Sequence, residues 1–454
     1  SPTNHPIPAM TLWEFLENTI LYQILLLLWI LFAWKYYLNY RQKSLMERLV
    51  DFPASVENIM SKEVYDKART YALDKQNFDN ISEIFQKIIT TAFLLVYYDR
   101  HAWSWGQDLI ELLGLNRDSE ILVSCAYMTI VNTVSVVLEM PFKVYDTFFL
   151  EGKHGFNKQS PLFFVKDQIL KFVVLHVLML PFLVGVIWII QNGGDYFFLY
   201  LWIFSLFATL FLMIIYPEVI APLFDKYSPL PEGELKQKIE ALAASVEFPL
   251  YKLFIVEGSK RSSHSNAYMY GFHKHKRIVL FDTLVKEYYK PDKDKDKADE
   301  AKGCETDEVL AVLAHEIGHW KYSHTLKAFF MAEIHFLVMT ILYAKLLHFK
   351  PMYEAFGFYD SQPIIIGLII VTVYYILIPV NTIMHVMMVV MGRRFEFEAD
   401  RFAQKLGHGE ALKKALIKLH KDNLGYPLFD KLYSSWHHNH PPLLERLEAI
   451  DKEE

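Results

Sequence analysis

The chain has 454 residues, of which 53% are hydrophobic, 15% aromatic and 22% charged. This composition excludes a disordered chain, a collagen-like fibre and a disulfide scaffold. The formal net charge of −6 gives no support for nucleic-acid binding, and the two cysteines, Cys125 and Cys304, indicate no disulfide framework.

Seven apolar stretches approach or reach the roughly 20 residues that a helix needs to cross a bilayer. The second stretch is short and ends at a charged pair, Asp99 and Arg100, whereas the fourth and fifth are joined only by residues 191–195. The sequence therefore predicts a mainly α-helical, multi-pass membrane protein. The expected transmembrane helices are 19–38, 84–98, 121–140, 172–190, 196–216, 326–347 and 364–391.

The basic residues between these stretches alternate from one crossing to the next. Residues 1–18 and 191–195 contain no Lys or Arg, whereas 39–83 contain seven and 141–171 contain five. Short loops rich in Lys and Arg stay on the cytosolic side of a membrane. We therefore expect the N-terminus in the lumen and the C-terminus in the cytosol.

The polar segment between the fifth and sixth stretches predicts a separate domain. It contains one amphipathic helical pattern, at 234–246, and three strand-like runs, at 252–256, 266–270 and 277–281. Residues 290–303 alternate in charge without apolar residues, which is typical of a solvated, mobile loop. The expected divisions are transmembrane helices one to five with their loops (1–216), a cytosolic domain (217–325), the last two transmembrane helices (326–391) and a cytosolic C-terminal part (392–454).

The motif His-Glu-x-x-His occurs once in this domain, at 315–319, within a helical pattern for which Thr306 is the expected N-cap. Because His315 and His319 are four residues apart, they share one face of a helix and can both bind one zinc ion. Glu316 projects beside that face, where it can act as a general base. The alternative is a surface helix with two histidines that bind no metal.

A third ligand must come from elsewhere in the chain. His324 is a candidate, but it does not stand at the spacing of the extended three-histidine motif. Glu396 is a better one, because Glu396 and Asp400 lie four residues apart on a helical stretch on the same predicted side of the membrane. One carboxylate could bind the metal while the other holds a ligating imidazole. The alternative is a surface helix with ordinary solvated carboxylates, which is what we expect of Glu398.

Eight short segments extend the pattern over nearly the whole chain: 150–157 (LEGKHGFN), 220–227 (IAPLFDKY), 257–271 (EGSKRSSHSNAYMYG), 277–284 (RIVLFDTL), 311–320 (AVLAHEIGHW), 356–363 (FGFYDSQP), 394–400 (RFEFEAD) and 440–446 (HPPLLER). With these segments the sequence closely resembles the integral-membrane CAAX prenyl proteases of type 1, a zinc metalloprotease family. The resemblance implies seven transmembrane helices around a water-filled chamber. A gluzincin-like zinc protease module with a small β-sheet would cap its cytosolic end.

The resemblance also implies roles for particular residues. It implies one Zn²⁺ per chain on His315, His319 and Glu396, with Glu316 as the catalytic base and Asp400 supporting the ligands. The remaining matches are His440 and Arg446 near the scissile carbonyl, and Asn266 and Ala267 in the substrate cleft. Taken alone, Asn266 could satisfy a strand edge, His440 could belong to a turn, and Arg446 could pair with Glu445.

The implied reaction is removal of the terminal tripeptide from prenylated CAAX proteins, and some members of the family make a second, upstream cut. The implied partners are farnesylated CAAX substrates and the lipid bilayer. The implied location is the endoplasmic reticulum membrane or the inner nuclear membrane. A quality-control protease that cuts misfolded or stalled membrane proteins with the same zinc chemistry remains the alternative function.

Overall fold

The computed structural model describes residues 11–271, 275–289, 302–374 and 378–452. Most of the charged segment 290–303 lies outside these ranges. The long helices and their neighbours are α1 (Leu12–Asn18), α2 (Ile20–Arg48), α3 (Lys62–Leu95), α4 (Tyr98–Leu112), α5 (Glu120–Val144), α6 (Glu151–Lys153), α7 (Pro161–Asn192), α8 (Phe197–Ile215), α9 (Ala221–Phe224), α12 (His324–Leu346), α13 (Lys350–Glu354), α14 (Ile364–Ile369) and α15 (Ile378–Lys405). Short helical turns are η1 (Ala54–Val56), η2 (Tyr145–Leu150), η3 (Gly194–Tyr196), η4 (Tyr216–Ile220), η5 (Gly258–Lys260) and η7 (Ile370–Tyr374).

The long helices begin where the sequence provides capping side chains. The hydroxyls of Ser61, Ser119 and Ser160 accept hydrogen bonds from backbone N–H groups in the first turns of α3, α5 and α7. Helix α7 also begins with Pro161, whose fixed φ suits the first helical position. These caps satisfy backbone donors that the helix itself leaves unpaired.

Five helical segments of the described chain are long and apolar enough to cross a membrane. They are Ile20–Arg48, Glu120–Lys153, Pro161–Asn192, Gly194–Phe224 and His324–Leu346. This supports a multi-pass membrane protein and matches the predicted first, third, fourth, fifth and sixth spans. The predicted seventh span passes through residues 375–377, outside the described ranges, so a seventh crossing stays a prediction.

The predicted second span differs from what the structure shows. Residues 84–95 are the end of α3, a helix of 34 residues that is not among the five candidate segments. Charged side chains continue along α3 as far as Lys87, which lowers its mean hydropathy. The helix ends at Leu95, and Tyr97 adopts a left-handed φ of 53°. A separate helix, α4, starts directly afterwards, so the sequence-based boundary at 98 was wrong.

The β-sheet contains the three predicted strands and a fourth. Its strands are β1 (Tyr227–Pro229), β2 (Leu250–Val256), β3 (Ala267–Tyr270) and β4 (Lys276–Phe281), in the order β1-β2-β4-β3. Strands β2 and β4 are parallel, and the other two pairs are antiparallel, with Ala267 opposite Leu280. Strand β1 was missed because three residues ending in proline carry too little alternation. The order leaves β3 at an edge of the sheet.

The sheet belongs to a compact module formed by two distant parts of the chain. Its helices are α10 (Glu234–Ser245), α11 (Thr306–Lys321), α16 (Gly409–Asp422) and α18 (Leu443–Lys452), whereas α17 (Lys431–His437) contacts α15 and α2. One hydrophobic core joins Ile239 and Ile278 from the first part to Ala403 and Leu412 from the second. The expected division at 391–392 falls inside the single helix α15. The C-terminal part is therefore a component of the module.

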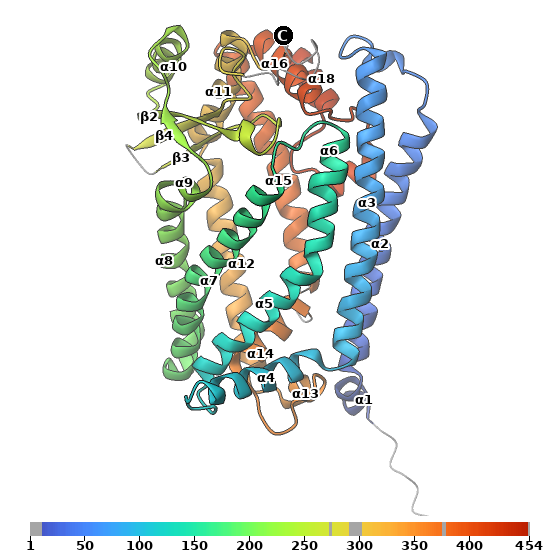
Figure 1. Cartoon of the computed structure of the whole chain (residues 1–454), viewed down its shortest axis with the longest axis vertical. Coiled ribbons are helices and arrows are strands. Elements are labelled where there is room, and N and C mark those ends of the chain that lie inside the picture. Colours follow the sequence, from blue (N-terminus) through green and yellow to red (C-terminus); the bar gives the residue numbers. More distant parts are fainter. Residues whose placement is uncertain (1–10, 272–274, 290–301, 375–377, 453–454) are drawn as a thin grey trace, which may run out of the picture.

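Figure 1 shows this module and the C-terminus at one end of the long helices, with α1, α4 and α13 at the opposite end. Helices α2 and α3 lie side by side along one flank and pack on each other. The C-terminal part of the chain contacts α2 near the end that is predicted to be cytosolic. The Arg41 guanidinium forms two hydrogen bonds, of 3.0 and 2.8 Å, with the Asp430 carboxylate that caps α17.

Candidate metal centre

The motif helix α11 forms where the sequence placed it, but its cap differs. The N-cap is Glu305, which exchanges hydrogen bonds with Glu308 in a capping box, and Thr306 is the first helical residue. The predicted N-cap at Thr306 was therefore wrong by one position. Glutamate can act as the N-cap here because its side-chain oxygen accepts a hydrogen bond from the backbone N–H of Glu308 in the first turn. Val309, Leu313 and Ile317 are fully buried and fix α11 in the module core.

Helix α11 packs closely across α15, and a glycine allows the close approach. A Cβ atom on Gly318 would lie 3.0 Å from the Ala399 Cα and 3.2 Å from the Ala399 carbonyl oxygen. Gly318 stands between the two motif histidines and next to His319 in sequence, and Ala399 lies between Glu396 and Asp400 in sequence. The helix contact therefore brings the two halves of the candidate site together.

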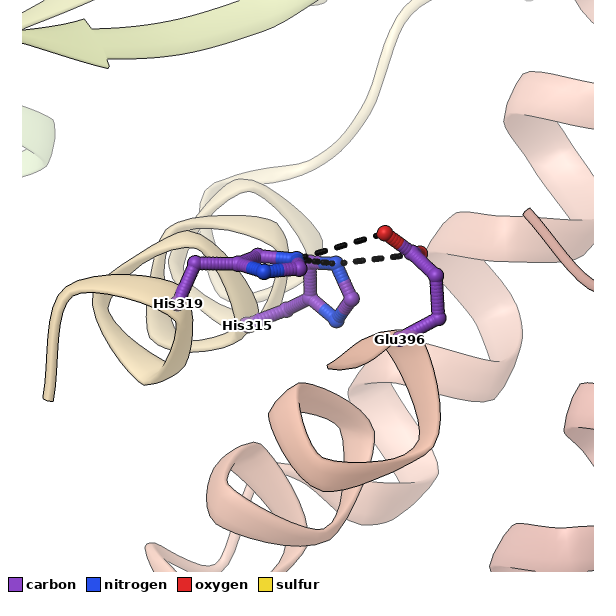
Figure 2. A group of neighbouring side chains, drawn as sticks. All are labelled: His315, His319 and Glu396. Carbon is purple, nitrogen blue, oxygen red and sulfur yellow. Dashed lines mark hydrogen bonds and ion pairs between the residues drawn. The ribbon is translucent and has the colours of Figure 1, made fainter. Parts of the chain in front are cut away.

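The side chains of His315, His319 and Glu396 converge on one point (Figure 2). The Nε2 atoms of the two histidines are 3.1 Å apart. The His315 Nε2 lies 3.5 Å from Glu396 Oε2, and the His319 Nε2 lies 3.3 Å from Glu396 Oε1. One ligand atom from each of the three residues lies within 4.8 Å of the other two.

Asp400 and Arg446 lie behind His315. The His315 Nδ1 is 2.8 Å from Asp400 Oδ1, and the Arg446 guanidinium holds both oxygens of the same carboxylate at 2.8 and 2.6 Å. Because Asp400 accepts the Nδ1–H, the Nε2 of His315 is left with its lone pair facing Glu396. The structure therefore brings Asp400 into contact with the ring of one candidate ligand.

His324 and Glu398 occupy the corresponding position behind His319. The His324 Nδ1 lies 2.9 Å from the His319 Nδ1, and the His324 Nε2 lies 3.0 Å from Glu398 Oε2. His324 points its ring at the far side of His319, away from the convergence point. The expectation of an ordinary solvated carboxylate at Glu398 was wrong, because α15 turns this side chain toward the buried His324 and only 22% of it is exposed.

The site contains two carboxylates that stay ionised although they are buried. Burial would raise the pKa of Glu396, but its contacts with His319 and His440 and the positive charge of Arg446 hold it well below its usual range. Burial opposes ionisation of Asp400 as well, and Arg446 and His315 together lower its pKa. Both groups are therefore negative at neutral pH.

Glu316 and His440 lie beside the three candidate ligands. The His440 Nδ1 is 3.0 Å from Glu396 Oε1, and 68% of the His440 side chain is exposed. The hydrogen bond to Glu396 raises the pKa of His440, and the Glu316 charge adds to that effect. The same Glu316 charge acts on Arg446. The charge of Glu316 therefore acts on both His440 and Arg446, which also contact Glu396 and Asp400, respectively.

Asn266 and Ala267 lie at the free edge of the sheet. Asn266 is exposed, and its carbonyl oxygen accepts a hydrogen bond from the Phe281 N–H of the neighbouring strand. Because backbone groups alternate along a strand, the Ala267 N–H faces away from β4, and it bonds to the Asn266 side-chain oxygen at 2.8 Å. The side chain of Ala267 is buried in the module core, so only its backbone faces the edge.

The residues present fit a zinc ion. Two imidazole Nε2 atoms and one carboxylate are a common protein ligand set of catalytic zinc, and this set leaves a coordination position open. The Glu396 Oε2 is buried and makes no hydrogen bond to the described part of the chain. Both histidines have their Nδ1 atoms engaged, so their Nε2 atoms are free to bind a metal. Among the described residues this is the one cluster of His, Cys, Asp and Glu with such geometry.

Sequence-family models cover the chain in two blocks. A model described as the CAAX prenyl protease N-terminal region with five membrane helices matches residues 41–226. A second model, peptidase family M48, matches residues 229–454. The boundary between the blocks falls in β1, close to the predicted start of the cytosolic domain.

Whole-chain comparisons agree with these family models. Proteins named CAAX prenyl protease 1 homolog from Mus musculus and Homo sapiens are each 44% identical to this chain, over 97% of both partners. The crystal structure of S. mikatae Ste24p matches with a TM-score of 0.85 and 33% identity, covering 95% of this chain and 98% of that chain. These matches confirm the resemblance inferred from the motifs. The chain therefore belongs to peptidase family M48 and, within it, to the integral-membrane CAAX prenyl protease 1 metalloendopeptidases.

Proposed function

We propose that this protein is a zinc endopeptidase that removes the terminal tripeptide from prenylated CAAX proteins. The observation that carries the proposal is the convergence of His315, His319 and Glu396, with one ligand atom from each within 4.8 Å of the others. The relatives above are named for this substrate class. A quality-control protease is not favoured, because no relative reported above carries such a name.

The proposed catalytic steps assign one task to each side chain. A zinc ion bound by His315, His319 and Glu396 would supply a Lewis acid that makes water a nucleophile near neutral pH. Glu316 would take a proton from the attacking water and deliver it to the leaving amine. His440 is exposed and can donate a hydrogen bond to the oxygen on which negative charge develops.

Arg446 has a different proposed task. Its guanidinium is engaged with Asp400 and is 12% exposed, which favours holding His315 in place over contact with the substrate. The substrate backbone would add as a further strand beside β3, where the Ala267 N–H faces the open edge. For the substrate to pair with β3, the Ala267 N–H must first break its hydrogen bond to Asn266 Oδ1. Asn266 would therefore control whether a substrate strand can pair with this edge of the sheet.

The membrane setting suits a lipid-anchored substrate. A prenyl chain partitions into hydrocarbon at about 0.8 kcal/mol per buried CH₂, which concentrates the substrate at the bilayer surface. We propose seven crossings around a water-filled chamber, with the N-terminus in the lumen and the module in the cytosol. The endoplasmic reticulum membrane is the proposed location, and the inner nuclear membrane would have the same orientation.

The decisive experiment compares two substrates with purified protein. A farnesylated CAAX peptide and its unprenylated twin are incubated with the full chain, with a chelator, and with the chelator followed by added zinc. We expect cleavage of the farnesylated peptide, loss of cleavage with the chelator and recovery with zinc. Equal turnover of the twin peptides would contradict a prenyl-directed activity and favour the quality-control function.

Glu316→Gln provides the matched control. General acid–base catalysis contributes roughly 10²–10⁴-fold, so we expect a loss in kcat of that size. Zinc content should remain one ion per chain as in the unmodified protein, because Glu316 is not among the proposed ligands. Turnover of the Gln variant at the original rate would remove Glu316 from the mechanism.

A further inference from the structure

We propose that His324 and Glu398 act as a positioning pair that orients His319 and sets the zinc affinity of the site. The inference rests on the proposed zinc function. It assigns a role to two residues for which the sequence provided none, a rejected ligand candidate and a presumed solvated carboxylate. Their contacts form one continuous chain from the Arg394 guanidinium to the metal-facing side of His319.

The direction of each hydrogen bond follows from the chemistry of its ends. Arg394 Nε donates to Glu398 Oε1 at 2.8 Å, so this carboxylate is paired with a cation and can only accept. His324 Nε2 therefore carries the hydrogen in its 3.0 Å bond to Glu398 Oε2. A neutral imidazole with a hydrogen on Nε2 has a lone pair on Nδ1. The His324 Nδ1 is thus an acceptor.

His319 must then be the donor in the next bond. Its Nδ1 lies 2.9 Å from the His324 Nδ1, and only an N–H on His319 can fill that contact. With its hydrogen on Nδ1, His319 presents an unprotonated Nε2 to the convergence point, which is the form that binds a metal. Asp400 imposes the same tautomer on His315 at 2.8 Å. Each proposed histidine ligand therefore has its own supporting acceptor.

The ring of His324 is also buried and stacked. His324 is 3% exposed, and its ring stacks on Phe395 with the centroids 4.0 Å apart and the planes 7° from parallel. Ser323, directly before it, has a left-handed φ of 56°, which ends α11 and allows α12 to start at His324. The turn between the two helices thus places the His324 ring behind His319. A histidine with a purely packing role would not need this alignment of both ring nitrogens.

The test measures zinc affinity of the purified full chain in detergent, by competition with a coloured chelator. Loss of a group that supports a metal ligand typically costs 10–100-fold in metal affinity. We expect a weakening of that size for His324→Phe, which keeps the ring but has neither nitrogen. Asn has an amide oxygen near the position of Nδ1, so His324→Asn should recover most of the affinity. Glu398→Ala, at a partly exposed position that tolerates truncation, should weaken binding by roughly tenfold.

The control variant is Phe395→Leu, which removes the stacked ring but leaves both hydrogen bonds of His324. We expect its zinc affinity to match that of the unmodified chain. Substitution of Co²⁺ adds a second readout, since its visible absorption spectrum reports ligand geometry and should change in His324→Phe but not in Phe395→Leu.

Three outcomes would overturn the inference. They are unchanged zinc affinity in both His324→Phe and Glu398→Ala, equal losses in His324→Phe and Phe395→Leu, and a lower unfolding temperature of the metal-free His324→Phe protein without any change in affinity. Failure of the unmodified chain to bind zinc would instead refute the proposed function, so the two failures can be told apart.

Discussion

At the scale of single residues, the site depends on buried charges that are held in pairs. Arg446 is 12% exposed and Asp400 3%, and their side chains meet through two hydrogen bonds of 2.8 and 2.6 Å. The family resemblance implied a position for Arg446 near the scissile carbonyl. A guanidinium engaged with a buried carboxylate is better suited to supporting the candidate ligands, because moving it would leave the Asp400 charge with only the His315 N–H as a partner.

We expect Arg446→Met to destabilise the protein strongly. Removing one partner of a buried ion pair costs roughly 3–5 kcal/mol, since the remaining charge stays buried. The measurement is the thermal unfolding midpoint of the metal-free protein in detergent. Combining Arg446→Met with Asp400→Leu removes both charges and should restore much of the stability without restoring zinc affinity. A single Arg446→Met variant as stable as the unmodified chain would show that the pair is not important for folding.

At the scale of elements, the contact between α11 and α15 determines whether the ligands meet. The sequence predicted both helices and their ligand-bearing faces from local periodicity. It could not predict the distance between them, which depends on the missing side chain at Gly318 and on the small Ala399 opposite. Strand β1 was also missed, because its three residues carry too short a pattern, and helix α4, of 15 residues, was not predicted as a separate helix.

We expect Gly318→Ala to impair the site without unfolding it. The added methyl group would lie 3.0–3.2 Å from atoms of α15, two of them backbone atoms of Ala399, so the helices must move apart by a few tenths of an ångström. A displacement of about 1 Å can cost 10²-fold in rate, so we expect a loss of roughly 3–10-fold in kcat/KM. Chelator competition should show weaker zinc binding as well. A variant with unchanged activity and affinity would mean that α15 accommodates the methyl group.

At the scale of the whole molecule, the protease module and the membrane helices are joined by contacts between segments far apart in sequence. The family-model boundary at β1 separates two sequence blocks, yet the C-terminal part returns to the membrane helices through Asp430 and Arg41. The Arg41–Asp430 contact therefore attaches the module to the membrane helices in addition to the continuous chain.

Chemical labelling tests the predicted orientation. In a chain whose two cysteines are replaced by alanine, single cysteines are introduced at Asp195, in the exposed turn before α8, and at Lys414, exposed on α16. We expect an impermeant maleimide to label Lys414→Cys in sealed microsomes, and Asp195→Cys only after the membrane is opened, because basic loops stay cytosolic. Labelling of both positions in sealed microsomes would contradict the predicted topology.

The amino-acid pattern alone indicated the family, seven apolar segments of which five are candidate spans, and the identities of the residues that converge. Hydrophobic length and helical spacing act over a few turns, so they can be recognised in a single chain. Packing in three dimensions showed that Glu396 Oε1 lies 3.3 Å from His319 Nε2, that the His324 Nδ1 lies 2.9 Å from the His319 Nδ1, and that Glu398 is bonded to His324. The contacts of Glu396 with His319 and of Glu398 with His324 join segments far apart in sequence, and they follow from the packing of α15 against α11 and the start of α12.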